Sequence, residues 1–330
     1  MFDRAIVRNA KKGNWAVYEN CQDVLVASEH RSVLSVLKTV EERASSDGLY
    51  AVGYVAYEAS HAFDRKFPQR HIDMPLVCFA LFANETHISS LTDLYSPDEQ
   101  TVADWQLLES RESFESKVDR IKSMIGAGEV YQINLTSRMS NQSQVTLADF
   151  VRWSLDMPHA VFLSGPEMTV CSASPELFFE REEGAVWSKP MKGTVGREPE
   201  AVADEANAHW LQASTKNRAE NLMITDMVRN DLARLSSTGK VSVDELFGVE
   251  RYPSVWQMTS TVKTEVSASI ADIFTALFPA ASITGAPKHA AVEVIDRLED
   301  SPRGLYTGAL GVIAPTGFAS FNVAIRTAWS

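Results

Sequence analysis

Two neighbouring strands predicted in the middle of the chain bring a carboxyl group close to an amine. Glu176 lies in Ser174-Pro-Glu-Leu-Phe-Phe179, and Lys192 lies in Lys189-Pro-Met-Lys-Gly-Thr194. The turn Glu182-Glu-Gly184 joins these segments as a hairpin, so the start of the first strand faces the end of the second. A lysine kept neutral by burial is a nucleophile, and a buried glutamic acid is a general acid. From spacing alone, an ordinary cross-strand ion pair is the better interpretation.

A second group of polar residues lies on a long helix predicted over residues 203–235. Lys216, Asn217 and Glu220 share one face of this helix. Glu220 can either pair with Lys216 or offer its carboxylate to a hard cation. Helix geometry alone favours the exposed ion pair, but the apolar run Leu222-Met-Ile224 beside it indicates contact with the core. The polar face is therefore expected to border a cavity.

Two further segments carry polar groups close to predicted turns. In Ser282-Ile-Thr-Gly-Ala-Pro-Lys288, a Gly and a Pro open a helix, which leaves backbone N–H groups for an anion with Lys288 nearby. A plain helix-capping turn explains this pattern equally well. Farther on, Arg326 lies in the apolar stretch Val323-Ala-Ile-Arg326 of a predicted strand. An arginine there is hard to bury unless a carboxylate binds its planar guanidinium.

The elements that must position these residues predict an α+β fold with a large, mostly antiparallel sheet flanked by helices. Strands are expected at 15–18, 50–57, 76–82, 130–136, 160–164, 168–173, 176–181, 185–191, 240–244, 255–264, 306–313 and 318–329, and helices at 30–43, 112–125, 147–155, 203–235, 270–277 and 287–298. The polar stretch 86–104 divides the chain into an N-terminal lobe, residues 1–100, and a second domain, residues 105–330. No Gly-rich phosphate-binding loop follows a strand.

Composition narrows the classes of partner and compartment. The formal net charge of −12 argues against binding to nucleic acid or to an anionic membrane, so an anionic substrate needs a local positive site. The longest apolar run, residues 76–83, is far shorter than the roughly 20 residues of a membrane helix. Three cysteines without pairing or metal-finger spacing favour a reducing compartment, which predicts a cytoplasmic protein.

Six motifs in order resemble the chorismate-utilising enzyme family, which includes anthranilate synthase component I, aminodeoxychorismate synthase component I, isochorismate synthases and salicylate synthases. The motifs are Gly128-Glu-Val-Tyr-Gln132, Ser174-Pro-Glu-Leu177, Lys192-Gly-Thr194, Arg218-Ala-Glu-Asn-Leu-Met223, Ser282-Ile-Thr-Gly-Ala-Pro-Lys288 and Arg303-Gly-Leu-Tyr-Thr-Gly-Ala309. They extend from about residue 128 to residue 326. The resemblance implies the family's fold, with a short N-terminal lobe followed by a chorismate-binding catalytic domain.

The resemblance also implies roles for individual residues. Lys192 is expected to be the covalent nucleophile and Glu176 the general acid, while Glu220 matches a carboxylate of the family's Mg²⁺ site. Asn217 stands where many relatives carry an acid, which leaves the number of metal ligands open. Substrate contacts are expected from Gln132, Gly193, Thr194, Gly285, Tyr306 and Arg326.

Three residues distinguish the branches of this family. Lys192 precedes Gly-Thr, as is typical of the aminodeoxychorismate synthase branch, whereas anthranilate synthases carry Ala there. Gln132 replaces the water-activating lysine of isochorismate and salicylate synthases, and Gln257 replaces a His of the anthranilate and salicylate branches. The implied reaction converts chorismate and ammonia to 4-amino-4-deoxychorismate, a precursor of 4-aminobenzoate and folate. A glutamine amidotransferase subunit is the expected source of ammonia.

Two alternatives remain open at this point. Anthranilate synthase component I uses the same substrate and amine donor, and a catalytically weak chorismate-binding protein could retain the fold. The second alternative arises from residues 318–329, an apolar strand pattern that stops at Ser330 without a following partner. Family members continue with a strand and a helix that complete the magnesium site. We therefore expect a truncated catalytic domain that lacks its final strand and helix and binds Mg²⁺ poorly.

Overall fold

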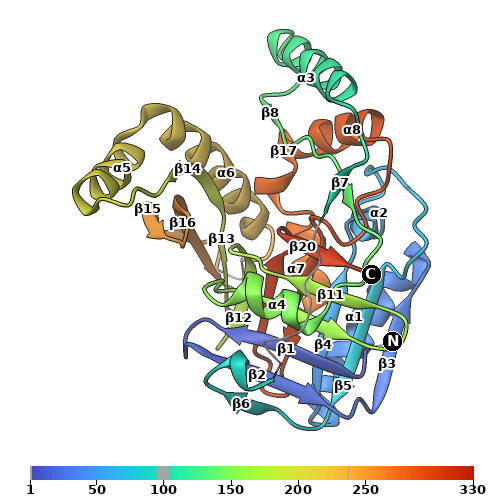
Figure 1. Ribbon diagram of the computed structural model, residues 1–330. Helices are drawn as coiled ribbons and strands as arrows, with labels where there is room; N and C mark the ends of the chain where they lie inside the picture. The colour runs from blue at the N-terminus through green and yellow to red at the C-terminus, as the bar shows by residue number, and fades with distance from the viewer. Residues whose placement is uncertain (1, 95–103, 237) are drawn as a thin grey trace.

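The computed structural model describes residues 2–94, 104–236 and 238–330, which form two stacked antiparallel sheets with helices around them (Figure 1). The smaller sheet has the order β20 (Thr327–Trp329), β11 (Thr169–Ser172), β10 (Val161–Ser164), β1 (Arg4–Asn9), β2 (Asn14–Glu19) and β6 (Thr86–Ile88). The larger sheet has the order β14 (Met191–Gly196), β16 (Val255–Glu265), β13 (Ala185–Lys189), β12 (Leu177–Glu182), β19 (Ala319–Val323), β18 (Ala309–Ile313), β4 (Tyr50–Val55), β5 (Val77–Phe82) and β3 (Asp23–Ala27), with β15 (Val241–Arg251) paired to β16. Two short pairs, β8 (Gln132–Ile133) with β17 (Gly285–Ala286) and β7 (Gln106–Leu107) with β9 (Met139–Ser140), lie outside these sheets.

Alternation along the central strands explains why the larger sheet is buried on both faces. On β4, Val52 and Tyr54 pack toward the smaller sheet, in one cluster with residues of β1 and β2. Ala51 and Val55 point the other way and join the cluster formed with the helices. Successive side chains of a strand point to opposite faces, so one run of apolar residues serves two cores.

The helices cover the outer faces of the sheets. They are α1 (His30–Ser46), α2 (Ser60–Phe63), α3 (Arg111–Gly126), α4 (Leu147–Ser154), α5 (Ala201–Ala213), α6 (Thr215–Ala233), α7 (Ile270–Leu277) and α8 (Lys288–Leu298), with short 3₁₀ turns at Tyr57–Ala59, Leu91–Leu94 and Ala281–Ile283. Apolar residues of α1, α6 and α7 pack on the larger sheet, and residues of α4 pack on the outer face of the smaller one. Of the helices in the described residues, none is both long and apolar enough to cross a membrane.

The α+β prediction with a large antiparallel sheet is confirmed. Both sheets combine strands from the first hundred residues with later ones: β1 pairs with β10, and β4 pairs with β18. The boundary predicted between residues 100 and 105 falls largely on residues 95–103, which lie outside the described residues. Each of the two sheets therefore contains strands from both sides of the predicted boundary.

The predicted helix over residues 203–235 is wrong in one respect, because the structure has two helices there. Ser214 separates α5 from α6 with an extended backbone, at φ −64° and ψ 112°. Its side chain accepts a hydrogen bond from the backbone N–H of Asn217 and so caps α6. Serine is favoured at N-caps since its hydroxyl satisfies an N–H that the helix leaves unpaired. The residues of interest, 216–220, therefore lie in the first turns of α6.

The expectation that residues 318–329 form one continuous strand is also wrong. Strand β19 ends at Val323 and pairs with β18, and β20 then joins the smaller sheet with Val170 opposite Trp329. Arg326, with φ 49°, lies at the crossing between the two sheets. Two other predicted strands are shorter or divided: β8 covers only part of 130–136, and Pro190 separates β13 from β14.

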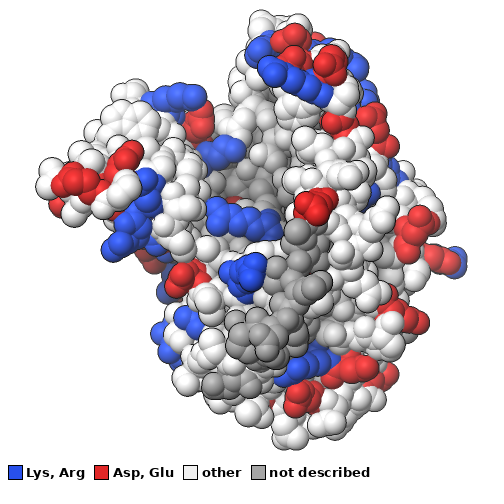
Figure 2. Space-filling view, in the orientation of Figure 1, with Lys and Arg blue, Asp and Glu red and all other residues white. Residues whose placement is uncertain are grey.

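Two groups of elements face each other at the top of the molecule as drawn in Figure 1, and the first of them includes one end of the larger sheet. One contains β14, β15, β16, α5 and α6, and the other contains α3, α8, β8 and β17. The surface is hollowed between these groups, and Lys and Arg side chains lie in and beside the hollow (Figure 2). A protein with a net charge of −12 therefore presents cations where these groups face each other.

Candidate active site

Glu176 lies at the base of the site, immediately before β12, and its side chain is almost completely buried. The hydroxyl of Ser282 donates to its Oε1 at 2.5 Å, and the backbone N–H of Met191 donates to the same atom at 3.4 Å. Burial raises the pKa of Glu176 to about 7, although these two hydrogen bonds and Lys192 act in the opposite direction. Near neutral pH, this carboxyl group can therefore hold a proton and donate it.

Lys192 is the second residue of β14, and its amine has the character expected of a nucleophile. Burial lowers the pKa of Lys192, while the carboxyl groups of Glu176 and Glu220 raise it. Among the described residues, the structure records no hydrogen bond or ion pair to its Nζ. Its carbonyl oxygen accepts a hydrogen bond from the side-chain amide of Asn221 at 3.2 Å, which fixes the backbone. The backbone of Lys192 is thus held in place, while its amine has no recorded hydrogen-bond partner.

The two residues after Lys192 shape the strand beside α6. Gly193 has φ 106°, and a Cβ atom at this position would lie 3.1 Å from the Cβ of Asn217. A side chain there is strained by its backbone and crowded by the helix. The hydroxyl of Thr194 donates to the side-chain oxygen of Gln257 at 2.9 Å, across the β14–β16 pair. Gln257 thereby orients Thr194 at the end of the site.

Glu220 faces the same region from α6 and remains available to a ligand. Its Oε1 lies 3.9 Å from the Nζ of Lys216, too far for a hydrogen bond, and its side chain is 37% exposed. Asn217 donates instead to the hydroxyl of Ser214 at 2.9 Å. Within the described residues there is no group of three or more His, Cys, Asp or Glu side chains that could hold a metal ion. A single carboxylate such as that of Glu220 is a ligand that a hard cation accepts.

Gln132 and Gly285 form the opposite wall, where β8 pairs with β17. A Cβ atom on Gly285, which has φ 151°, would lie 2.1 Å from the carbonyl oxygen of Gln132, so only glycine fits. The side-chain Oε1 of Gln132 is buried and has no hydrogen-bond partner. A buried amide oxygen without a partner is costly, and a ligand donor would satisfy it.

Tyr306 and Arg326 approach the site from the crossing between the sheets. Tyr306 lies in the turn after Arg303, and that turn is joined to the crossing because Thr307 donates its N–H to the carbonyl of Ala324 at 2.8 Å. Arg326 is exposed and contacts the sulfur of Met157 at 3.6 Å. It is not buried in a strand, and no carboxylate among the described residues binds it. Its guanidinium is therefore open to an anionic ligand.

Two side chains outside the predicted site, those of Ser282 and Arg303, join segments that carry predicted site residues. Ser282 links Glu176 to the turn that leads into Gly285, and Arg303 binds several of the surrounding segments. Both lie inside recognised motifs, yet their spacing gave no role for their side chains. Lys288, considered above as a neighbour of an anion, instead forms an ion pair with Asp231 at 2.6 Å.

Glu176 offers a protonatable acid, Lys192 an unpartnered amine and Arg326 an open guanidinium. The acid and the amine are electrostatically coupled, since each alters the pKa of the other. Such a pair can add an amine to an electrophilic carbon while a proton is delivered to a leaving group. The guanidinium suits a carboxylate on the reacting molecule.

Comparison with known proteins identifies the family of the chain. A family described as chorismate binding enzyme matches residues 91–330. The chain is 39% identical over 238 residues to an aminodeoxychorismate synthase from Streptomyces pristinaespiralis, covering 70% of this chain and 33% of that protein. It is 35% identical over 242 residues to aminodeoxychorismate synthase component 1 from Escherichia coli, covering 71% of this chain and 53% of that protein. The chain thus spans a third to about half of the length of these relatives.

The fold agrees with solved structures as well. Anthranilate synthase component I from Streptococcus pneumoniae superposes with a TM-score of 0.77 at 24% identity, covering all of this chain and 82% of the other. At this identity the likeness establishes the fold, which includes both stacked sheets. The family match covers most of the chain and contains all the predicted site residues, from Gln132 to Arg326. This chain belongs to the chorismate binding enzyme family.

Proposed function

We propose that the protein is the catalytic subunit of an aminodeoxychorismate synthase, which replaces the 4-hydroxyl group of chorismate with an amino group. This proposal depends on two electrostatically coupled groups. Lys192 is partly desolvated and has no hydrogen-bond partner, and the pKa of Glu176 is raised to about 7. The named relatives with 35–39% identity support the same activity. The product serves 4-aminobenzoate and folate biosynthesis.

In the proposed mechanism, the neutral amine of Lys192 forms a bond to C2 of chorismate. The ring double bonds shift, the C4–oxygen bond breaks, and Glu176 gives its proton to the departing hydroxyl group, which leaves as water. Ammonia then forms a bond to C4, and the C2–nitrogen bond breaks to release the lysine. A covalent intermediate divides one difficult substitution into two easier steps.

The remaining residues bind and orient the substrate in this proposal. Arg326 holds the pyruvyl carboxylate through its open guanidinium, and Tyr306 contacts the substrate from the adjoining turn. Gln132 supplies its unpartnered oxygen, and Gly285, Gly193 and Thr194 complete the walls. Gln132 cannot act as a base toward water at C2, which disfavours isochorismate formation.

We further propose Mg²⁺ as the cofactor, with Glu220 as its protein ligand. When bound, the ion neutralises the ring carboxylate of the substrate. Calorimetry with chorismate should show binding that weakens when EDTA removes Mg²⁺, and Glu220→Gln should lose most of that dependence. Equal affinity for chorismate with and without Mg²⁺ would contradict this assignment.

A glutamine amidotransferase subunit is the proposed source of ammonia, and the cytoplasm is the proposed location. The three cysteines, Cys21, Cys78 and Cys171, are free thiols, as is usual in a reducing compartment. Ammonium salts replace the amidotransferase in the experiments below, so the test of the chemistry does not depend on the partner.

The decisive experiment is intact-mass analysis of the protein with chorismate and without ammonia. We expect a covalent adduct on the wild type and none on Lys192→Ala. Lys189→Ala is the matched control, because Lys189 lies in the same segment but is ion-paired with Glu250. An adduct that persists in Lys192→Ala would refute the assigned nucleophile.

Product analysis then separates this function from its alternatives. With chorismate and ammonium ions, we expect 4-amino-4-deoxychorismate, which yields 4-aminobenzoate only after a lyase is added. Direct formation of fluorescent anthranilate would instead identify an anthranilate synthase. Chorismate binding without any turnover would identify a non-catalytic binding protein.

A further inference from the structure

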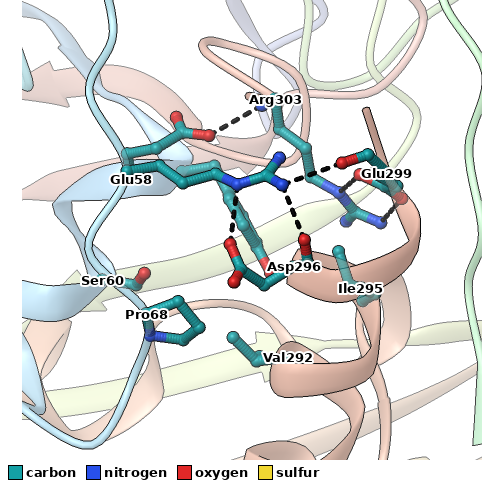
Figure 3. A pocket seen from close by; sticks show the side chains of 10 residues that line it. Glu58, Ser60, Pro68, Val292, Ile295, Asp296, Glu299 and Arg303 are labelled. Atoms are coloured by element: carbon teal, nitrogen blue, oxygen red, sulfur yellow. Dashed lines mark hydrogen bonds and ion pairs between the residues drawn. The ribbon is translucent and has the colours of Figure 1, made fainter. Parts of the chain in front are cut away.

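Arg303 is a buried arginine whose five N–H groups all donate hydrogen bonds. Two of them bind the carboxylate of Glu299, from Nε at 2.9 Å and from Nη2 at 2.7 Å. The others bind the carbonyl of Ile283 at 3.0 Å, the hydroxyl of Thr307 at 3.1 Å and the carbonyl of Asn134 at 2.8 Å. Figure 3 shows the guanidinium facing Glu299 at the end of α8. A guanidinium with every donor satisfied is rigidly held.

The three acceptors outside Glu299 belong to three separate segments of the proposed site. Asn134 follows Gln132 by two residues, Ile283 precedes Gly285 by two residues, and Thr307 adjoins Tyr306. These segments come from distant parts of the sequence: 169 residues separate Asn134 from Arg303. Strands β8 and β17 are already paired with each other, and this one side chain joins that pair to the turn that bears Tyr306.

The backbone of Arg303 is fixed independently of its side chain. The carboxylate of Glu58 accepts the N–H of Arg303 at 2.7 Å and that of Gly304 at 3.0 Å (Figure 3). Burial raises the pKa of Glu58, and these N–H groups act against that rise. Glu58 thus holds the backbone of Arg303 and Gly304 at the start of the turn that bears Tyr306. The arginine side chain therefore extends from a fixed backbone position.

We propose that Arg303 is a positioning residue that holds Gln132, Gly285 and Tyr306 at the separation that chorismate requires. This proposal rests on the proposed function, which assigns substrate contact to those three residues. Arg303 itself faces away from the substrate, since all its donors are used within the protein. Lys192 and Glu176 lie on segments that Arg303 does not bind, so its removal should affect substrate binding more than the covalent step.

Lysine cannot replace arginine in this role. An ammonium group has three donors around one atom, whereas the guanidinium presents five donors in a planar fork. Arg303→Lys keeps the charge beside Glu299 but cannot also reach Asn134, Ile283 and Thr307. The variant therefore separates the positioning effect from the electrostatic one.

Arg70 provides a matched control in the same pocket. Its Nε lies 2.7 Å from a carboxylate oxygen of Asp296, and its Nη2 donates to the carbonyls of Asp296 and Glu299 at 2.6 and 2.9 Å. It binds the same helix, α8, and lines the same cavity as Arg303. Its recorded partners include no segment that bears a proposed substrate contact.

The test compares steady-state kinetics of the wild type, Arg303→Lys and Arg70→Lys with chorismate and ammonium chloride. For Arg303→Lys we expect KM for chorismate to rise by about tenfold or more, while kcat at saturation changes by less than about threefold. Arg70→Lys should leave both constants near the wild-type values. If Arg303→Lys does not fold, Glu299→Gln, which weakens the same contact, should show a smaller rise in KM. An unchanged KM in the folded variant would overturn the proposal, as would an equal rise in Arg70→Lys.

Hydrogen exchange of the free protein tests the proposal without relying on activity. The amides of Tyr131, Asn134 and Thr307 donate to Ala286, Thr284 and Ala324 across the segments that Arg303 joins. Their exchange should accelerate in Arg303→Lys but not in Arg70→Lys, while amides of the β4–β18 pair should stay protected in both. Unchanged exchange at those three amides would refute the positioning role. Absence of turnover by the wild type would refute the proposed function instead, and this readout would still decide the role of Arg303.

Discussion

Two acid–base pairs, Lys192 with Glu176 and Arg303 with Glu299, differ in how completely their hydrogen bonds are satisfied. Arg303 and Glu299 form a bidentate pair, and every donor of the arginine has an acceptor. Lys192 acts on Glu176 only through its charge, and no hydrogen bond to its amine is recorded in the described residues. The pKa of Arg303 is raised despite burial, whereas that of Lys192 is lowered by it.

The difference indicates which pair supports the structure and which can react. A buried charge with all its partners is stable in that form and has no reason to change. A partly desolvated amine without partners gives up its proton more readily, and a buried acid keeps its own. Perturbed groups of this kind gather at functional sites. A cation and a carboxyl group therefore stabilise the structure at Arg303 and Glu299, whereas at Lys192 and Glu176 they are able to react.

The largest expected contrast is in stability. Arg303→Ala should lower the free energy of unfolding by about 3–5 kcal/mol, because Glu299 would remain buried without its partner. Lys192→Met should change it by less than about 1 kcal/mol, since no hydrogen bond is lost and burial of a cation is relieved. Urea unfolding at pH 6 measures both. Equal losses in the two variants would remove the distinction between the pairs.

The next effect concerns catalysis by the acid. Glu176→Gln should reduce kcat by about 10²–10⁴-fold, as is usual when a general acid is removed. Glu182→Gln is the control and should retain activity, because Glu182 lies at the far end of β12 with its side chain 43% exposed. In the wild type, kcat should fall as pH rises through about 7, where Glu176 loses its proton. A wild-type profile without that limb would argue against Glu176 as the acid.

A third effect is the pH dependence of stability. The pKa of Glu176 is about 7 in the folded protein, above the ordinary value of 4.5, so the folded state retains the proton more strongly. This stabilisation is complete below pH 4.5 and is lost as pH rises toward 7, by on the order of 3 kcal/mol. Denaturant titrations across this range should show a steeper loss of stability in the wild type than in Glu176→Gln. Parallel curves would contradict the raised pKa.

The smallest expected effect refines the description of the acid. Ser282 donates a hydrogen bond that lowers the pKa of Glu176, so Ser282→Ala should raise that pKa further. The alkaline limb of the kcat profile should move upward by less than about one pH unit. Ser282→Thr keeps the donor and should keep the wild-type profile. A downward shift in Ser282→Ala would mean that the hydroxyl binds the protonated acid.

The sequence predicts those parts of the site that depend on neighbouring residues. The hairpin between Glu176 and Lys192 is local, so alternation and one turn suffice to bring the two groups together. Ser214 was overlooked because helical patterns on both sides conceal a cap. The crossing at Arg326 is not predicted because the apolar pattern continues through residues 324–326, which separate β19 from β20 and end with the left-handed backbone of Arg326.

The contacts of Arg303 illustrate what sequence spacing cannot supply. Its acceptors at Asn134 and Ile283 are backbone carbonyls, which every residue carries, so no residue type marks them. The partners also lie far apart in the chain, and only the folded sheets bring them within reach. The spacing of Glu299 and Arg303, four residues apart, was the one available signal of this pair.

The chain passes from one sheet to the other at residues 324–326, and this crossing links ligand binding to the thermal stability of both sheets. Strand β19 belongs to the larger sheet and β20 to the smaller one, so Arg326 is fastened to both layers. Under the proposed function, a carboxylate bound by that guanidinium contacts the segment that joins the two sheets. Saturating substrate should then make the two layers melt as one cooperative unit at a higher temperature, even though the ligand contacts only their rim.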